Sequence, residues 1–250
     1  MAIENAVIVL ADIGGYTRFM NRQKQSLAHA EATITELLDS VIEAAEHPLT
    51  LNKLEGDAVL FYASATDAPL AAVAKDALHQ VNGFFDAFAR RKQEMIQYVK
   101  CDCGGCEQLP NLSIKAVLHC GEINRRKFRK VEELSGMSVI TAHRLMKNSV
   151  PVKEYLLVTD EFKRVAGGMP GQAGTPLVED CEGVGPVKVV YYLPDRSAQR
   201  PPLETSPWRK MRMMAKAMRF LTLRRLGFTK KRRFHNLEKL GTAAAADSPA

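Results

Sequence analysis

Two aspartates occupy positions where a predicted strand gives way to a glycine-containing turn. Asp12 follows the apolar run AVIVLA at 6–11, and Asp57 follows Gly56 between the segments LTLNKLE and AVLFYA. Two carboxylates that leave neighbouring strands in this way can bind Mg²⁺ or Mn²⁺, with substrate phosphates completing the metal's shell. An aspartate beside glycine is also ordinary turn chemistry. The pair therefore indicates a metal site only if the elements around it bring the two acids together.

The hydrophobic pattern predicts these elements. Apolar residues spaced by three or four indicate helices, and short apolar runs between turn residues indicate strands. The expected elements, in chain order, are a strand at 6–11, a helix at 24–46, a hairpin at 49–63, a helix at 67–99, a loop at 100–111, a strand at 112–120 with its hairpin partner at 121–128, a helix at 136–148, a strand at 154–159, a short helix at 160–165 and two strands within 176–193.

Recurrent hairpins in this order exclude a purely parallel, doubly wound sheet. We expect an α+β fold, with a mixed antiparallel sheet on a ferredoxin-like core and helices on one face. The composition of the 250 residues, 46% apolar and 25% charged, suits a globular core. No apolar run approaches the roughly 20 residues of a membrane span, and the N-terminus lacks the basic start of a secretory signal. A cytoplasmic protein is expected.

Four segments resemble the catalytic domain of the class III nucleotidyl cyclases, in a diverged bacterial branch. VLADIGGYTRF is similar to that family's first metal motif, and KLEGDAVL to its Lys-x-x-Gly-Asp hairpin. IKAVLHCGEI resembles its Ile-x-x-Gly-Ile-x-x-Gly-Glu-Val strand and turn. SGMSVITAHRLM resembles its Trp-Gly-x-x-Val-Asn-x-Ala-x-Arg-Met helix. The motifs occur in the family's order over residues 6–193, so the resemblance implies the cyclase fold.

The resemblance assigns metal binding to the first two motifs. Asp12 and Asp57 would hold two Mg²⁺ or Mn²⁺ ions, and the carbonyl of Ile13 would contribute to the shell. Gly14 and Gly15 would leave backbone N–H groups free to approach a polyphosphate. The substrate implied is a nucleoside triphosphate, and the reaction is cyclisation of ATP to cyclic AMP.

The resemblance assigns base reading and transition-state stabilisation to the other motifs. Lys53 and Glu133 fall on the two base-reading positions, and Lys53 is the residue that favours adenine. Arg144 falls on the catalytic arginine that stabilises charge in the transition state. The family's site is shared between two chains, so a head-to-tail homodimer is implied.

Two departures from the family pattern affect turnover. Ile140 stands where the family has an asparagine, four residues before Arg144, and it cannot donate a hydrogen bond. Val184 stands near the family's phosphate-gripping lysine, and Lys188 lies four residues further on. His143 or Thr141 could replace the asparagine. The alternative is a catalytically lapsed domain that binds nucleotide or metal and signals through its C-terminal tail.

A cysteine cluster lies outside the cyclase motifs. Cys101, Cys103 and Cys106 are closely spaced around two glycines, before a strand that ends in His119 and Cys120. Three thiolates with one of these two side chains would complete a zinc site. A redox role or a tight loop of idle thiols fits the same spacing.

The C-terminus carries most of the positive charge. Residues 207–250 contain 12 Lys and Arg and two acids, which is +10, and the remainder is 23 − 26 = −3. We expect a cyclase-like domain at 1–195, a linker at 196–207, a basic amphipathic segment at 208–240 and a disordered tail at 241–250. The segment would bind an anionic membrane surface, making the protein peripheral, would bind an acidic protein, or would fold back on an acidic surface of its own domain. Nucleic acid is the less favoured partner.

Overall fold

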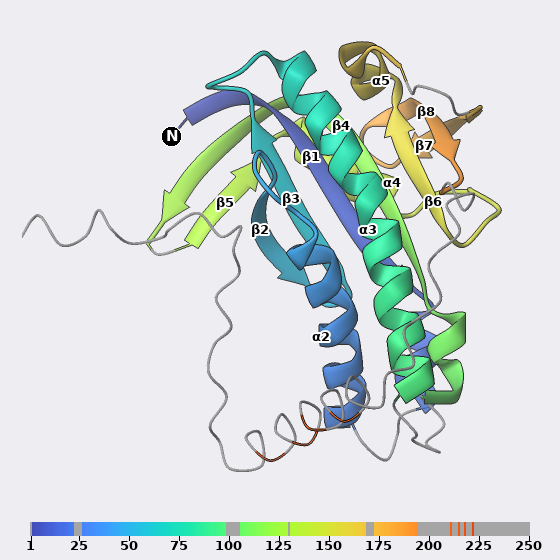
Figure 1. Ribbon diagram of the computed structural model, residues 1–250. Helices are drawn as coiled ribbons and strands as arrows, with labels where there is room; N and C mark the ends of the chain where they lie inside the picture. The colour runs from blue at the N-terminus through green and yellow to red at the C-terminus, as the bar shows by residue number, and fades with distance from the viewer. Residues whose placement is uncertain are drawn as a thin grey trace, which may run out of the picture.

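A computed structural model describes residues 2–22, 27–98, 106–129, 131–168 and 173–194, together with residues 211, 215, 218 and 222. It contains an eight-stranded sheet with helices against both faces (Figure 1). The strands are β1 (Ala2–Gly14), β2 (Thr50–Glu55), β3 (Ala58–Ser64), β4 (Ser113–Phe128), β5 (Val131–Ser135), β6 (Tyr155–Thr159), β7 (Thr175–Cys181) and β8 (Gly185–Tyr192). The helices are α1 (Tyr16–Arg22), α2 (Leu27–Glu43), α3 (Leu70–Tyr98), η1 (Cys106–Asn111), α4 (Met137–Leu145) and α5 (Asp160–Ala166).

The sheet is mixed, as the recurrent hairpins predicted. Its strand order is β2-β3-β1-β4-β6-β8-β7, and β5 pairs with β4 off this path. All neighbouring strands are antiparallel except β4 and β6, which run parallel. This pair is parallel because β5 and α4 carry the chain from the end of β4 back to the edge of the sheet where β4 begins, and β6 starts there.

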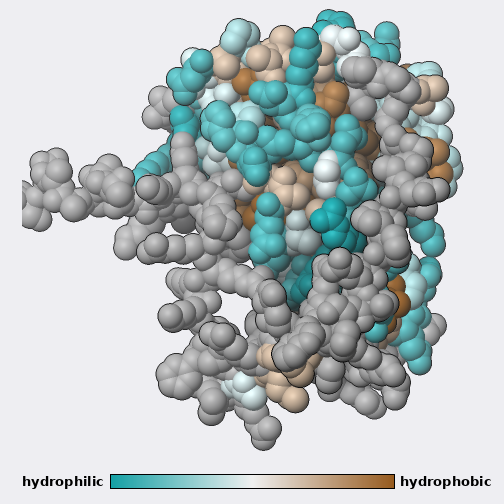
Figure 2. Space-filling view, viewed as in Figure 1, coloured by the Kyte–Doolittle hydropathy of each residue, from teal (hydrophilic) through white to brown (hydrophobic). Residues whose placement is uncertain are grey.

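Alternate residues of β1 show why both faces are covered. Val7 and Val9 belong to the core beneath α2, α3 and α5, whereas Ile8 and Leu10 belong to the core beneath α4. The expectation of helices on one face is therefore wrong, because α4 has an apolar side that must also be buried. On the face of the sheet covered by α2, α3 and α5, the apolar residues of α3 point toward the sheet. The outer surface over α3 is therefore largely hydrophilic (Figure 2).

Apart from two short helices, the order of strands and helices matches the prediction, but one hairpin was wrongly placed. Residues 113–128 form a single strand, β4, and its hairpin partner is β5 rather than residues 121–128. Gly121, which suggested a turn, lies within β4. A side chain there would place its first carbon 2.4 Å from the Ser138 hydroxyl oxygen, so the glycine admits α4 against the strand. The pattern also missed α1 and η1.

Most of the C-terminal region lies outside the described residues, including the expected linker at 196–207 and the tail at 241–250. Within 208–240, Met211, Ala215, Met218 and Thr222 are helical and exposed. Among the described residues, none of the helices combines the length and the apolar character needed to span a bilayer.

Candidate functional site

The structure brings Asp12 and Asp57 together at one end of the sheet. Asp12 is near the end of β1, between Ala58 of β3 and Lys115 of β4. Asp57 occupies the tight turn between β2 and β3, and its carbonyl accepts a hydrogen bond from the Ile13 N–H at 3.1 Å. This bond fastens the turn to the end of β1. Two acids that are 45 residues apart in sequence therefore become neighbours through strand pairing.

The charge of the Asp12 carboxylate acts on the Asp57 carboxyl. Partial burial, together with the charge of Asp12, raises the pKa of the Asp57 carboxyl from 3.8 to about 6. A hydrogen bond from the Asp57 backbone and the charge of Lys115 offset part of this effect. Two carboxylates that repel each other in this way form a site that favours a bound cation.

Lys115 is a charged residue of this site that the sequence analysis missed. Its Nζ lies 3.2 Å from Oδ2 of Asp12 and donates a hydrogen bond to the carbonyl of Met146 at 2.9 Å. The sequence places Lys115 in a strand. Only the register of β4 against β1 shows that it stands opposite Asp12.

Gly14 and Gly15 each meet a backbone requirement. A side chain at Gly14 would place its first carbon 2.5 Å from the Ser113 hydroxyl oxygen. Gly15 has a φ of 90°, which disfavours other residues, and its carbonyl accepts a hydrogen bond from the Phe19 N–H at 3.0 Å. The two glycines thus let β1 turn directly into α1 beside the carboxylates.

The donors at this end of the sheet suit a hard divalent cation. Among the residues that the structure describes, no group of three or more His, Cys, Asp or Glu side chains is placed to hold a metal. Mg²⁺ commonly takes one or two carboxylates and completes its shell with substrate phosphates. Asp12, Asp57 and the Ile13 carbonyl fit that pattern.

A second cluster contains the two base-reading candidates. Nζ of Lys53 in β2 lies 4.0 Å from Oε2 of Glu133 in β5 and 3.0 Å from Oε1 of Glu55. The imidazole Nδ1 of His143 in α4 lies 3.5 Å from the other oxygen of Glu55. β5 and α4, which follow each other in the chain, thus meet the distant strand β2 around one lysine.

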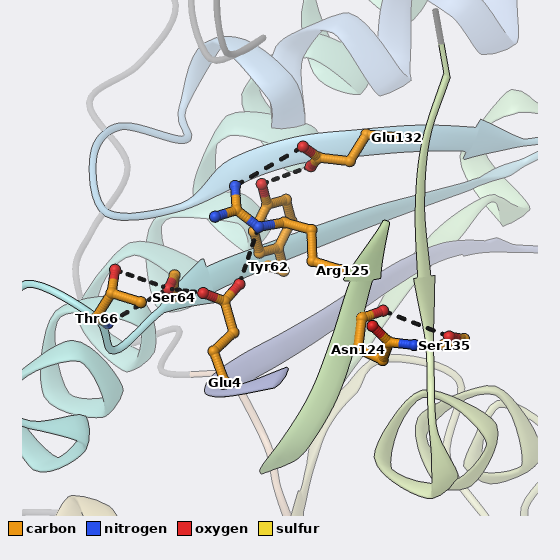
Figure 3. A network of polar contacts seen from close by, with 8 residues as sticks. All are labelled: Glu4, Tyr62, Ser64, Thr66, Asn124, Arg125, Glu132 and Ser135. Atoms are coloured by element: carbon orange, nitrogen blue, oxygen red, sulfur yellow. Dashed lines mark hydrogen bonds and ion pairs between the residues drawn. The ribbon is translucent and has the colours of Figure 1, made fainter. Parts of the chain in front are cut away.

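A polar network holds β5 in place, and Figure 3 shows the part of it that joins Glu132 to Tyr62 and Arg125. The hydroxyl of Tyr62 donates to Oε1 of Glu132 at 2.6 Å, and Asn52 donates to the Glu132 carbonyl at 3.4 Å. Arg125 of β4 pairs with Glu4 of β1 at 3.0 Å and with Glu132 at 3.7 Å. Because these contacts hold Glu132 against the sheet, the next residue, Glu133, is held near Lys53.

The exposed side of α4 carries Arg144 and Ile140. Arg144 pairs with Glu182 at 3.1 Å, and Ile140 is 45% exposed. Of the two proposed replacements for the missing asparagine, Thr141 is buried and donates its hydroxyl to the Met137 carbonyl at 2.8 Å. His143 faces the Lys53 cluster and remains the better placed candidate.

The last hairpin places no lysine in its turn. The N–H of Val184 donates to the Cys181 carbonyl at 2.9 Å and closes the turn between β7 and β8. Lys188 lies within β8, opposite Val178. The structure therefore does not bring Lys188 to the position at which the resemblance expects a phosphate-gripping lysine.

The cysteine cluster is described only in part. Cys101 and Cys103 lie outside the described residues, and Cys106 begins η1. His119 and Cys120 lie well along β4, about 20 Å beyond its start at roughly 3.3 Å per residue. Burial raises the pKa of the Cys120 thiol to about 11, and the His119 imidazole contacts Thr159. Both candidates for the fourth zinc ligand thus lie well along β4, beyond its start next to η1, which Cys106 begins.

Sequence comparison connects the chain to a protein family. The family model described as "Protein of unknown function (DUF2652)" matches residues 34–155, from α2 to the start of β6. Over 169 residues, the chain is 37% identical to "Uncharacterized protein Rv2561/Rv2562" of Mycobacterium tuberculosis, covering 68% of this chain and 76% of that protein. The chain belongs to the family of this mycobacterial protein. The region matched by the family model contains Asp57, Lys115 and Arg144.

The fold of this family member is that of nucleotidyl cyclase domains, as predicted. The adenylyl cyclase CyaB from P. aeruginosa matches with a TM-score of 0.61 at 14% identity, over 78% of this chain and 96% of that chain. The guanylate cyclase domain of RhGC from Catenaria anguillulae, solved in complex with GTP, matches with a TM-score of 0.58 at 18% identity, over 78% of this chain and 100% of that chain. Identities this low show a shared fold, so activity must be argued from the residues.

Proposed function

We propose that this protein is a metal-dependent nucleotidyl cyclase that forms cyclic AMP from ATP. The observation that carries the proposal is the Asp12–Asp57 pair, with the Lys115 ammonium 3.2 Å from Asp12. Two neighbouring carboxylates and a cation at the end of a sheet can receive a metal-bound polyphosphate. The likeness to an adenylyl cyclase and to a GTP-bound guanylate cyclase domain supports this reading.

Asp12, Asp57 and the Ile13 carbonyl would hold two Mg²⁺ or Mn²⁺ ions together with the substrate phosphates. When bound, such ions neutralise phosphate charge and lower the pKa of the attacking 3′-hydroxyl. Lys115 already lies beside Asp12. It would exchange part of that ion pair for a phosphate oxygen, since an ammonium is a suitable point charge for phosphate.

Lys53 and Glu133 would read the base. The Lys53 ammonium can donate to a ring nitrogen of adenine, and the Glu133 carboxylate can accept from its exocyclic amine. In the structure, Lys53 pairs with Glu55 at 3.0 Å. Arg144 would leave Glu182, which is largely exposed, and donate to the charge that develops on the α-phosphate.

We propose that the active protein is a homodimer whose two chains share each site. The support comes from exposed apolar side chains close to the base-reading residues. Leu54, Met137 and Ile140 are 46%, 57% and 45% exposed. Leu54 follows Lys53 directly, and the other two lie on the exposed side of α4. A second copy of the chain would cover them.

The deciding experiment is a cyclic nucleotide assay on the purified full chain with Mn²⁺ and either ATP or GTP. We expect cyclic AMP from the parent and none from Asp57→Ala. Asp67→Ala is the matched control, because it removes an exposed carboxylate from the loop after β3. Equal activity of the parent and Asp57→Ala would contradict the proposal, and so would parent protein that neither binds nor converts ATP–Mn²⁺.

Ile140 favours a second candidate, a nucleotide sensor without turnover. An exposed isoleucine one turn before Arg144 offers no hydrogen bond to the ribose or phosphate at the position where the family has asparagine. This candidate predicts that ATP–Mn²⁺ binds, that Asp57→Ala abolishes binding and that no cyclic nucleotide forms.

A further inference from the structure

A gap opens in the sheet where β6 ends. β6 lies between β4 and β8, and it stops at Thr159. Its pairing with β4 ends at Leu118, and its pairing with β8 ends at Val189. Both neighbours continue past these points, because β4 runs on to Phe128 and β8 begins at Gly185. Two strand edges therefore face each other with no strand between them.

The connections of β6 leave this gap uncovered. The helix before β6, α4, packs on one face of the sheet, and the helix after it, α5, packs on the other. Parallel strands whose connections run to opposite faces form a crevice at their carboxyl ends, and in open sheets ligands bind there. The parallel pair β4 and β6 meets that condition at this end.

A pocket of about 630 Å³ occupies the gap, which is the size range of small-molecule sites. It is separate from the Asp12–Asp57 pair, since its walls come from the middle of β4, from α4, from the first turn of α5 and from the start of β8. Its apolar wall is formed by Val184, Pro186 and Val187.

Two polar side chains converge on the floor of the pocket. The Ser138 hydroxyl and Nε2 of His119 lie 2.4 and 3.6 Å from the point where a side chain on Gly121 would begin. Nδ1 of His119 contacts the Thr159 hydroxyl at 3.0 Å. Among the described residues, no hydrogen bond is formed by Nε2 of His119. Burial lowers the pKa of this imidazole, so the ring is neutral and offers one uncharged nitrogen to the pocket.

The rim of the pocket has one cation without an acidic partner. Arg164 is paired with Asp160 at 3.5 Å and with Glu161 at 3.7 Å. Lys188, by contrast, forms no ion pair with any residue that the structure describes. Asp160 and Glu161 also line the pocket and share Arg164, so the Lys188 ammonium is the cation there that can neutralise a bound anion.

We propose that this pocket binds a small organic anion. Its carboxylate or phosphate group would lie between the Lys188 ammonium and the Ser138 hydroxyl, and its apolar part would pack against Val184 and Val187. This site goes beyond the proposed cyclase activity. It shares α4 and the β7–β8 hairpin with the Arg144–Glu182 pair.

The test uses benzoate and phenyl phosphate as probes, with neutral benzamide as the uncharged analogue. Each is titrated into the isotope-labelled full chain while backbone amide shifts are followed by NMR. We expect saturable shifts at Cys120, Gly121 and Ser138 with a millimolar Kd, as suits fragments of this size. Benzamide should bind at least about tenfold more weakly. The stronger of the two anions identifies a carboxylate or a phosphate ligand.

Lys188→Ala should weaken anion binding by about tenfold or more, because it removes a charge-assisted hydrogen bond. Lys153→Ala is the matched control, since it removes the same charge at the other end of β6 and should change nothing. Equal binding by Lys188→Ala, shifts confined to Gly14 and Gly15, or no saturable shift with either anion would overturn the proposal. No arm depends on cyclase activity, so this proposal and the proposed function fail separately.

Discussion

Asp12 and Asp57 are held by paired strands and are partly buried, whereas Arg144 and Ile140 stand on the exposed side of α4. The first pair is positioned by backbone hydrogen bonds, including the one from Ile13 to Asp57. The second pair is positioned by a helix surface, and Arg144 is held by an acid, Glu182, that is itself exposed. The backbone at both aspartates is thus fixed by hydrogen bonds, whereas the Arg144–Glu182 pair lies at the surface.

This difference shows which half of the proposed site can change without harm to the fold. Replacing a donor on the exposed side of α4 by Ile140 leaves the buried contacts of the helix intact. A change at Asp12 or at its turn would alter a strand junction. The proposed metal-binding half is therefore tied to the fold, whereas the proposed turnover half is not.

The largest effect that tests this difference between the aspartate pair and the exposed side of α4 is expected when Arg144 is replaced. Arg144→Ala should lower kcat for cyclic AMP formation by about 10²–10³, because it removes one transition-state donor. KM for ATP should change little, since the metal-binding half is untouched. Steady-state assays with Arg90→Ala, an exposed arginine on α3, as the matched control would check this. An unchanged kcat would mean that the exposed half of the site takes no part in catalysis.

A smaller effect is expected at Lys53. Lys53→Ala should lower kcat/KM for ATP by about 10-fold or more, because it removes a hydrogen-bond donor to the base. It should also reduce the ratio of kcat/KM for ATP to kcat/KM for GTP. Competition assays with both nucleotides would measure the ratio, and Lys75→Ala on α3 is the charge-matched control. A preserved ATP to GTP ratio would exclude Lys53 from base reading.

Ile140→Asn is expected to raise kcat by about 10-fold, since it returns a donor one helical turn from Arg144. The control is Ile140→Ala, which shortens the side chain and offers no hydrogen bond. Equal gains in the two variants would point to relief of a steric block. No gain in the asparagine variant would support His143 as the replacement already in place.

The smallest effect concerns stability in the metal-free protein. The pKa of Asp57 is about 6 in the folded state and 3.8 without perturbation, so the folded state loses stability as the carboxyl ionises with rising pH. Asp57→Asn removes this charge. We expect its Tm to match the parent below about pH 4 and to exceed it by about 2–4 °C above pH 7.

That shift corresponds to about 1 kcal/mol, which is less than the full pKa difference implies because the carboxyl is partly exposed. Thermal unfolding in EDTA at several pH values would measure it, with Asp67→Asn as the control. A parent that gains stability relative to Asp57→Asn as the pH rises would show that the two carboxylates are not in conflict.

The local pattern was enough to predict the order of elements and the placement of both aspartates at strand and turn junctions. Apolar periodicity and glycine turns depend on residues within a few positions of one another, and the sequence displays them directly. The same reasoning failed at Gly121. The sequence cannot show that this glycine serves a contact with Ser138 rather than a turn.

Tertiary structure alone decided the register of the strands and which residues of distant segments come into contact. Lys115 stands opposite Asp12 because β4 pairs with β1 across about 100 residues of chain, and no local pattern encodes that register. The same holds for Lys53 beside Glu133 and for the gap beyond Thr159. The Lys53–Glu133 contact and the gap both depend on how one strand lies against another strand that comes much later in the chain. The sequence by itself determined which elements form and where the acids stand on them, and long-range packing decided what those acids face.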